Sequence, residues 1–301
     1  MSSHSYIPDQ KNEDIFININ GKLFHRSDAK ISVFDSGFLL GDGVWEGIRL
    51  HKSKLVFIEE HIDRLFTSAK GISLDIPLSR ENIIDELNKV LKKNNMNDDI
   101  HIRLIISRGD KITPYQNPNA NVGPINFVII PEYKKTNPDT YIQGVTIGMV
   151  DNIRPNDNIL SPHYNTLSKL NCILASIEAN KLGYDEGIMN DINGNISTCN
   201  STNLFFIQDN TVITSTGEYC LNGITRGKAI QLCHENNIQC NEMNFTFEDI
   251  INCDEAFVTG TFAGIIPVAK LENKELKSTN PSSMVNKIRK LYNKKIEEYI
   301  G

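Results

Sequence analysis

Two glycine-containing turns in the second half of the sequence have the residue types that bind an anion. In "LNGITRGKAIQLC", Gly223, Ile224 and Thr225 open a predicted helix, where backbone N–H groups lack helical partners and the helix dipole favours negative charge. In "VTGTFAGIIPV", Gly260 and the Thr261 hydroxyl lie in a turn between predicted strands. Each turn fits a phosphate contact, although Gly-Ile-Thr before a helix is also an ordinary N-cap sequence.

The hydrophobic periodicity of the second half predicts the elements that hold these turns. We expect strands at "GVTIGMV", "EAFVTG" and "IIPVAKL", short strands around the Asn193-Gly194 and Asp209-Asn210 turns, and helices at "LNCILASIEANKLG", after "GITR" and from Ser282 to Tyr299. Gly183 is expected to end the first of these helices, because glycine adopts the left-handed conformation at helix C-termini.

The first half predicts a smaller sheet with two helices. "IFININGKLF" alternates apolar residues before an Asn20-Gly21 pair, which is the strongest short signal for a hairpin. The other predicted elements are helices at "FIEEHIDRLFTSAK" and after Ser79, and strands at "IHIRLIIS" and "INFVIIP". The sequence therefore predicts a mixed α/β (α+β) fold.

A polar segment without periodicity, "EYKKTNPDTY", separates the two halves. Its Lys, Asn, Pro and Asp residues are typical of a connection between elements. We therefore predict an N-terminal domain over residues 1–131, a linker over 132–141 and a C-terminal domain over 142–301.

Composition and charge argue against several classes of function. A formal net charge of −6 and a pI near 5.7 oppose nucleic-acid binding, which needs a basic surface. No apolar run approaches the roughly 18 residues of a membrane helix, and the polar start lacks the apolar stretch of a signal peptide. The six cysteines form no CxxC pair or metal-ligand spacing. We expect a cytoplasmic protein with reduced thiols, without a metal site and without a membrane or nucleic-acid partner.

The order of several motifs identifies a resemblance to a known family. "FDSGFLLGDGVWEGIRL", "HIDRL", "GYDEGIMND", "TNLFF", "LNGITR" and "DEAFVTGTFAGIIPV" follow one another over Ile15 to Val268. Together they closely resemble the class IV aminotransferases, which include branched-chain and D-amino acid aminotransferases and aminodeoxychorismate lyase. The resemblance implies the two-domain fold-type IV architecture, with pyridoxal 5'-phosphate in the cleft between the domains. It also implies a small amino acid and a keto acid as substrates, and a homodimer in which the partner lends residues to each site.

The resemblance assigns cofactor contacts to the anion-binding turns and to one arginine. Arg64 in "HIDRL" matches the arginine that binds the cofactor phosphate, although a charge on a helix is more often simply solvated. Ile224 and Thr225, which follow Gly223, match the backbone and hydroxyl contacts. Thr261, after Gly260, matches the second phosphate-binding threonine.

Three further residues match positions that surround the substrate in the family. Arg103 in "HIRLI" resembles a residue near the substrate carboxylate, for which a bidentate guanidinium is suited; the alternative is a surface arginine on a strand. Leu40 and Trp45 match positions that line the side-chain pocket, often with Tyr and Phe, so a changed pocket is implied. Trp45 is equally compatible with ordinary core packing.

The sequence departs from the family at the Schiff-base lysine. In "SPHYNTLSKLN", aligned through the following helix, Asn165 takes that position, and an amide cannot form an imine. Lys169 stands four residues later, where many relatives carry a tyrosine beside the cofactor's aldehyde carbon. One helical turn, about 6 Å, keeps the same face, so we expect Lys169 to supply the amine. This needs a pKa well below the ordinary value of roughly 10.4; the alternative is a solvated lysine on a helix's first turn.

A second departure concerns the partner of the pyridine nitrogen. Thr198 stands in "NISTCNSTNLFF" where the family has a glutamate. Threonine is neutral and does not hold a proton on the ring nitrogen, which weakens the ring as an electron sink. Transamination is expected to suffer more than elimination or racemisation.

Two accounts of these departures stay open. In the first, the protein is a pyridoxal phosphate enzyme with a relocated lysine, an aminotransferase with a lyase as the variant. In the second, it binds a phosphorylated ligand without catalysis. Asn165, Cys199 and Asn200 are further candidates for lining the site.

Overall fold

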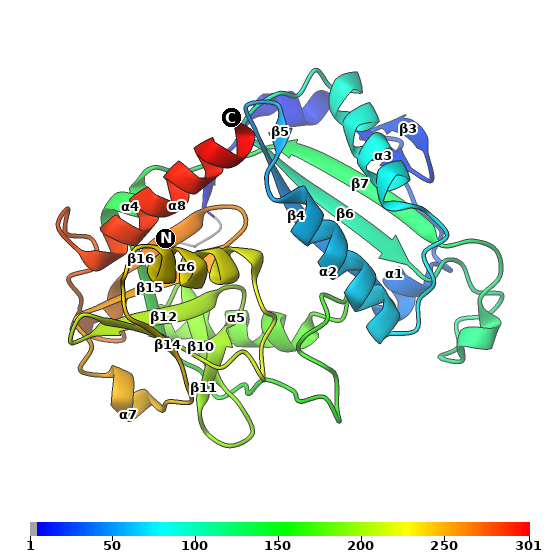
Figure 1. The fold of residues 1–301 in the computed structure, drawn as a ribbon. Coiled ribbons are helices and arrows are strands. Elements are labelled where there is room, and N and C mark those ends of the chain that lie inside the picture. Colours follow the sequence, from blue (N-terminus) through cyan, green and yellow to red (C-terminus); the bar gives the residue numbers. More distant parts are fainter. Residues whose placement is uncertain (1–4) are drawn as a thin grey trace.

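The first half of the chain folds as a six-stranded antiparallel sheet (Figure 1). The structure is a computed structural model and describes residues 5–301. The strand order is β3-β2-β7-β6-β4-β5, with β2 Phe16–Ile19, β3 Lys22–His25, β4 Gly43–His51, β5 Lys54–Leu55, β6 Ile100–Ser107 and β7 Asn126–Tyr133. The predicted hairpin is confirmed, because Asn20 and Gly21 join β2 to β3 with φ angles of 54° and 81°.

Two amphipathic helices cover one face of this sheet, as predicted. Helix α2 spans Ile58–Gly71 and α3 spans Arg80–Lys93; both bury their apolar faces in one core with the strands. The Ser79 hydroxyl accepts from the Asn82 N–H while the Asn82 side chain accepts from the Ser79 N–H, which satisfies two exposed donors at the start of α3.

The second half forms a nine-stranded sheet with helices on its faces. Strand β9 pairs in parallel with β10 and β16 and so joins β10 and β11 to the rest of the sheet. The strands are β9 Val145–Met149, β10 Glu186–Asn190, β11 Ile196–Cys199, β12 Asn203–Gln208, β13 Thr211–Thr214, β14 Cys240–Glu242, β15 Glu255–Gly260, β16 Gly264–Leu271 and β17 Lys274–Glu275. The helices are α5 Leu170–Leu182, α6 Ile224–Glu235, α7 Phe247–Ile250 and α8 Met284–Ile300. The expected mixed α/β fold is confirmed.

The expected end of one helix is confirmed, the start of another is shifted, and several short elements were not predicted. Gly183 ends α5 in the left-handed conformation, with φ 84°. The last helix begins at Met284 with Ser283 as its N-cap, two residues after the expected start. Short elements that periodicity did not indicate are α1 Ser36–Leu40, α4 Asp139–Gln143, η1 Gln10–Asp14, η2 Pro118–Ala120 and the small pair β1 Tyr6–Ile7 with β8 Lys135–Thr136.

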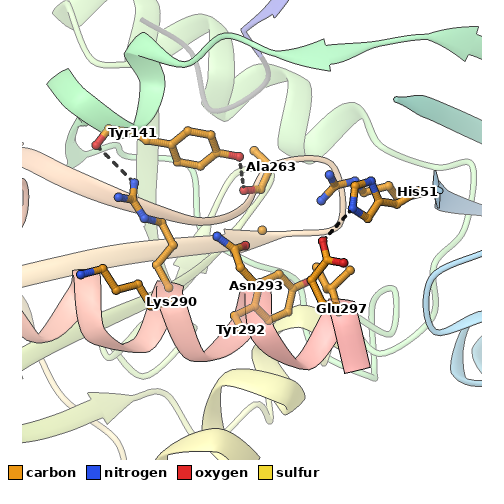
Figure 2. Close-up of a pocket in the computed structure, with 11 residues that line it drawn as sticks. His51, Tyr141, Ala263, Lys290, Tyr292, Asn293 and Glu297 are labelled. Carbon is orange, nitrogen blue, oxygen red and sulfur yellow. Dashed lines mark hydrogen bonds and ion pairs between the residues drawn. The ribbon is translucent and has the colours of Figure 1, made fainter. Parts of the chain in front are cut away.

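The two halves meet through side chains and through backbone pairing. Phe57, between β5 and α2, packs in the core of the second half with its ring 6.3 Å from that of Tyr292. His51 at the end of β4 contacts the Glu297 carboxylate of α8 at 3.2 Å (Figure 2). An isolated bridge pairs Val44 with Thr166, so the loop before α5 is attached to β4. The loop before α5 is therefore fixed against the sheet of the first half.

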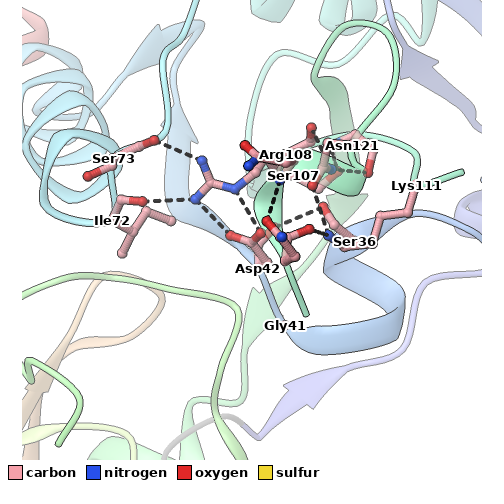
Figure 3. A network of polar contacts seen from close by, with 12 residues as sticks. Ser36, Gly41, Asp42, Ile72, Ser73, Ser107, Arg108, Lys111 and Asn121 are labelled. Carbon is pink, nitrogen blue, oxygen red and sulfur yellow. Dashed lines mark hydrogen bonds and ion pairs between the residues drawn. The ribbon is translucent and has the colours of Figure 1, made fainter. Parts of the chain in front are cut away.

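A half-buried polar network holds the turn that leads into β4 (Figure 3). Arg108 donates to both carboxylate oxygens of Asp42, at 2.8 and 3.0 Å, and to the carbonyls of Ile72 and Ser73, each at 2.8 Å. Gly41, which ends α1, has a φ of 68°. The network joins the end of β6 to the end of α2 and so positions the start of β4.

The segment expected to link two domains contains regular structure. It includes the end of β7, all of β8 and the start of α4. The two sheets lie on either side of it in the sequence, while the domain boundaries at 131 and 142 stay a prediction. Along residues 5–301, no helix combines the length and apolar character needed to cross a membrane.

Candidate active site

The loop before α5 positions Asn165 and Lys169. The Trp45 N–H donates to the Asn165 carbonyl at 3.0 Å, and the Leu167 N–H donates to the Gly43 carbonyl at 2.9 Å. The loop thus extends the edge of β4, and α5 begins directly after it with Lys169 as its N-cap residue. The Lys169 Nζ lies 5.7 Å from the Trp45 ring centre. Attachment to a sheet edge gives this lysine a defined position.

Asn165 serves as a structural tie in this loop. Its Nδ2 donates to the Trp45 carbonyl at 2.7 Å, and its backbone N–H donates to the Ser68 Oγ at 3.0 Å. The side chain is 1% exposed, and its Oδ1 has no partner among the described residues. The amide therefore holds the loop against β4 and leaves one buried acceptor unsatisfied.

A cavity of about 400 Å³ opens beside this loop. It is lined by Trp45, Arg103, Arg154, Asn165, Lys169, Cys172, Ile173, Ser176, Asp185, Glu186, Thr198, Cys199, Asn200, Ser201, Thr202, Asn203 and Leu221. The structure thus brings together seven residues that sequence reasoning singled out: Trp45, Arg103, Asn165, Lys169, Thr198, Cys199 and Asn200.

The environment of Lys169 favours its neutral, nucleophilic form. Burial lowers the pKa of the Lys169 amine from 10.5 to about 8. The Cys172 side chain opposes this shift in pKa. The neighbouring guanidinium groups add to it, namely those of Arg154, Arg64 and Arg103. A lysine of this kind provides a nucleophile or a base near neutral pH.

Arg103 presents a fixed positive charge in the same cavity. Its guanidinium stacks on the Trp45 ring at 3.7 Å from the ring centre. Burial lowers the pKa of the Arg103 guanidinium, while the charges of Glu132 and Glu46 act in the opposite direction. Because the group stays protonated at any ordinary pH, it is suited to bind a carboxylate.

The Thr198 hydroxyl, on β11, donates its hydrogen bond to another group of the protein. Its Oγ1 donates to the Thr202 carbonyl at 2.7 Å and accepts from Asn203 Nδ2 at 3.4 Å. The hydroxyl is therefore not free to donate to a ligand in the cavity without breaking a buried hydrogen bond.

The residues matched to a phosphate site lie outside the lining of this cavity. Arg64 donates through Nε and Nη2 to the two oxygens of Glu46, at 2.8 and 2.7 Å. Burial alone would raise the pKa of the Glu46 carboxyl, but Arg64 and His61 outweigh burial and hold this pKa below its ordinary value. Leu40 also lies outside the lining; it is 39% exposed on α1.

The two turns lie at the start of α6 and between β15 and β16. Gly223 is the N-cap of α6 and has no side chain to cap the helix, so N–H groups at this end are open to a ligand. Ile224 begins the helix, and the Thr225 Oγ1 lies 3.4 Å from the Tyr292 hydroxyl. Gly260 ends β15, and Thr261 opens the turn that follows.

Sequence reasoning missed two buried charged residues in the cavity wall. Arg154 is 7% exposed, donates through Nη1 to the Cys172 Sγ at 2.9 Å, and its Nε has no partner among the described residues. Glu186, 1% exposed at the start of β10, accepts from the hydroxyls of Ser201 and Thr202 at 2.6 and 3.1 Å. A charge within an otherwise apolar strand, as in "YDEGIM", was the available signal for Glu186.

No group of three or more His, Cys, Asp or Glu side chains is placed to hold a metal ion within residues 5–301. All six cysteines are free thiols.

Comparisons with known proteins agree on one family. The model of the family "Amino-transferase class IV" matches residues 43–271. The branched-chain-amino-acid aminotransferase-like protein 1 of Arabidopsis thaliana is 32% identical over 97% of this chain, which spans only about half (52%) of that relative's length. A putative branched-chain-amino-acid aminotransferase of Methanocaldococcus jannaschii is 34% identical over 92% of this chain and 94% of its own length.

A solved structure extends the likeness to three dimensions. The branched-chain amino acid aminotransferase of Escherichia coli superposes with a TM-score of 0.86 at 26% identity, covering 94% of this chain and 95% of the other. The fold is therefore the fold-type IV architecture that the motifs implied. The match of the family model over most of the chain, together with these relatives, shows that the chain belongs to the class IV aminotransferase family.

Proposed function

We propose that the protein is a pyridoxal 5'-phosphate-dependent aminotransferase in which Lys169 supplies the amine that attaches the cofactor. The observation that carries this proposal is a lysine amine with a pKa of about 8 in the wall of the cavity. Lys169 is the only lysine among the described residues of that wall. Asn165 occupies the usual position of the amine and is committed to the Trp45 carbonyl.

Residues next to the lining of the cavity fit the phosphate of a phosphorylated aldehyde: the lining residue Asn203, for example, pairs with Thr259 across the sheet. The α6 terminus at Gly223 offers unpaired N–H groups, and the buried Thr259 Oγ1 beside Gly260 has no partner among the described residues. Arg64 uses Nε and Nη2 on Glu46, which leaves Nη1 for a phosphate oxygen. We assign the phosphate contacts to Arg64, to the start of α6 at Gly223, Ile224 and Thr225, and to Gly260 with Thr261.

When bound, pyridoxal phosphate supplies an electron-withdrawing ring that stabilises negative charge on the α-carbon of an amino acid. The protein's part is to bind the substrate carboxylate and to move the α-proton. Arg103, held over Trp45, is placed to bind the carboxylate. The Lys169 Nζ, with a pKa of about 8, is matched to remove and return the α-proton near neutral pH.

We propose a small amino acid and its keto acid as substrates, either branched-chain or of the D series. Trp45 occupies part of the pocket wall and reduces the space for a side chain. Leu40, which is exposed on α1, would reach a substrate pocket only in an assembly that brings α1 to a cavity.

A lyase is the second candidate, and Thr198 is the observation that favours it. This neutral side chain stands where relatives carry a glutamate, and its proton is donated to the Thr202 carbonyl. Without an acidic partner the ring nitrogen is not held protonated, which affects elimination less than full amino transfer.

We further propose a homodimer. Helix α5 exposes an apolar stripe at helical spacing beside the cavity: Leu170, Ile173, Leu174 and Ile177 are 45–66% exposed. The segment around α1 adds Val33 and Phe38, each 67% exposed. Apolar surface of this extent supports an interface between copies of the chain.

We also propose two domains, 1–131 and 142–301, because each holds its own sheet. We propose a cytoplasmic location, which the six free thiols support.

The test compares amino transfer by the wild-type protein, Lys169→Ala and the control Lys181→Ala. Lys181 is an exposed lysine on the same helix and has no part in the cavity. Each purified protein is incubated with pyridoxal phosphate, a panel of L- and D-amino acids and pyruvate. We expect visible absorption and alanine formation from the wild type and from Lys181→Ala, and a loss of at least about a hundredfold in Lys169→Ala. Wild-type rates in Lys169→Ala would contradict the proposal. Ammonia release in place of alanine formation would select the lyase.

A further inference from the structure

A second cavity lies between the end of β4, the turn between β15 and β16 and helix α8 (Figure 2). Its volume is about 470 Å³, and it shares no lining residue with the cavity around Lys169. It is formed by the end of β4, by α4, by the β15–β16 turn and by α8. The lining residues are Arg49, His51, Tyr141, Ala263, Gly264, Arg289, Lys290, Tyr292, Asn293, Ile296 and Glu297.

The charge of this lining is unbalanced. Arg49, Arg289 and Lys290 have no carboxylate within ion-pair distance in the part of the chain that the structure describes. Glu297 is the one carboxylate in the lining, and its oxygens already contact His51 at 3.2 Å and Lys52 at 2.6 Å. The cations around the cavity therefore have no counter-charge left within the lining.

Arg289 is held in place before any ligand arrives. Its Nη2 donates to Asn286 Oδ1 at 2.6 Å, and its Nη1 donates to the Tyr141 carbonyl at 3.4 Å. Tyr141 is fixed in turn, because its hydroxyl donates to the Ala263 carbonyl at 2.8 Å. Burial lowers the pKa of the Arg289 guanidinium, which nevertheless stays charged at any ordinary pH. A preorganised cation loses little entropy on binding an anion.

The remaining walls suit an organic group attached to the anion. Tyr292 and Ile296 present apolar surface from α8, and Ala263 and Gly264 line the cavity from the β15–β16 turn. The volume is that of a small-metabolite pocket rather than of a single bound ion. A planar guanidinium donates to two oxygens of a phosphate, and two such groups on separate elements match the double negative charge of a phosphate monoester. One carboxylate would leave positive charge unbalanced.

We propose that this cavity binds a phosphomonoester metabolite, with the phosphate between Arg49, Arg289 and Lys290 and the organic group against Tyr292 and Ile296. This site is separate from the aminotransferase site and does not depend on the function proposed for it.

Binding is measured by calorimetry on the protein saturated with pyridoxal phosphate, with phenyl phosphate as the probe and constant salt. Lys290→Gln is the main variant, because Lys290 is exposed and makes no side-chain hydrogen bond within residues 5–301, so its loss leaves the fold intact. We expect Lys290→Gln and Arg289→Gln each to weaken binding by roughly tenfold. The control Lys287→Gln removes the same charge from an exposed position on α8 outside the lining and is expected to bind as the wild type does.

Three results would overturn the proposal. One is wild-type affinity in both Lys290→Gln and Arg289→Gln. Another is equal or tighter binding of succinate, which would exclude a phosphate-specific site. The third is loss of phenyl phosphate binding in Arg64→Gln while Lys290→Gln retains it, because that would place the phosphate in the site of the proposed cofactor.

Discussion

Replacing Lys169 by methionine is expected to stabilise the protein at neutral pH. Methionine keeps an unbranched apolar stem of similar length and removes the amine. The native state lowers the pKa of Lys169 from 10.5 to about 8, because burial penalises the charged form. In the unfolded chain the amine binds its proton more tightly, so this lysine favours unfolding wherever the unfolded chain carries the extra proton.

The size of the effect follows from the two pKa values. At pH 6.5 a shift from 10.5 to about 8 corresponds to about 3 kcal/mol of lost stability. At pH 9.5 the unfolded amine is partly neutral, and the loss falls to about 1 kcal/mol. The difference in free energy of unfolding between Lys169→Met and the wild type should therefore decrease as the pH rises from 8 towards 10.5. Below pH 8 it should stay constant.

Urea denaturation of the cofactor-free proteins at pH 6.5 and 9.5 measures this difference in free energy of unfolding. The control is Lys181→Met, whose exposed amine should give nearly equal stability to the wild type at each pH. A Lys169→Met variant that is less stable than the wild type by the same amount at pH 6.5 and 9.5 would refute the reasoning. That result would mean that Lys169 is solvated and titrates as an ordinary lysine.

Three further variants test how the site is built and assembled. Asn165→Ala removes the 2.7 Å bond to the Trp45 carbonyl and should cost about 1–2 kcal/mol in urea denaturation, whereas unchanged stability would contradict its role as a tie. Arg108→Ala leaves the half-buried Asp42 carboxylate without its bidentate partner, and we expect a loss of about 1–2 kcal/mol, which Arg108→Lys should only partly recover. Leu174→Glu places a charge in the apolar stripe of α5 and should give a monomer in analytical ultracentrifugation if the wild type is a dimer through this face; a dimer in both would exclude the face.

Local signals in the sequence were enough for the elements with strong periodicity or clear caps. The Asn20-Gly21 hairpin and the Ser79-capped helix are encoded by a few neighbouring residues, so their contacts are predictable without the fold. Strand β4 was different. It is buried on most of its length, and Glu46 lies on its buried face with Val44 and Ile48. This charge interrupts the apolar pattern of the buried face, and only its pairing with Arg64 of α2 explains its position.

Site residues that belong to sequence motifs were predictable, whereas residues placed by contacts between distant segments were not. Lys169, Thr198, Trp45 and Arg103 were identified through motifs, and the structure brings all four to one cavity. Arg154 was not identified, because nothing near it in the sequence shows that it is buried beside Cys172. Its position depends on contacts between segments that only the folded chain brings together.

The central claim is that the Lys169 amine forms the bond to the cofactor. Treating the protein with pyridoxal phosphate and then with borohydride fixes that bond, and peptide mapping by mass spectrometry identifies the modified lysine. We expect the label on Lys169 at pH 8 and above, because with a pKa of about 8 half or more of the amine is then neutral. Labels spread over exposed lysines such as Lys181, with none on Lys169, would contradict the account.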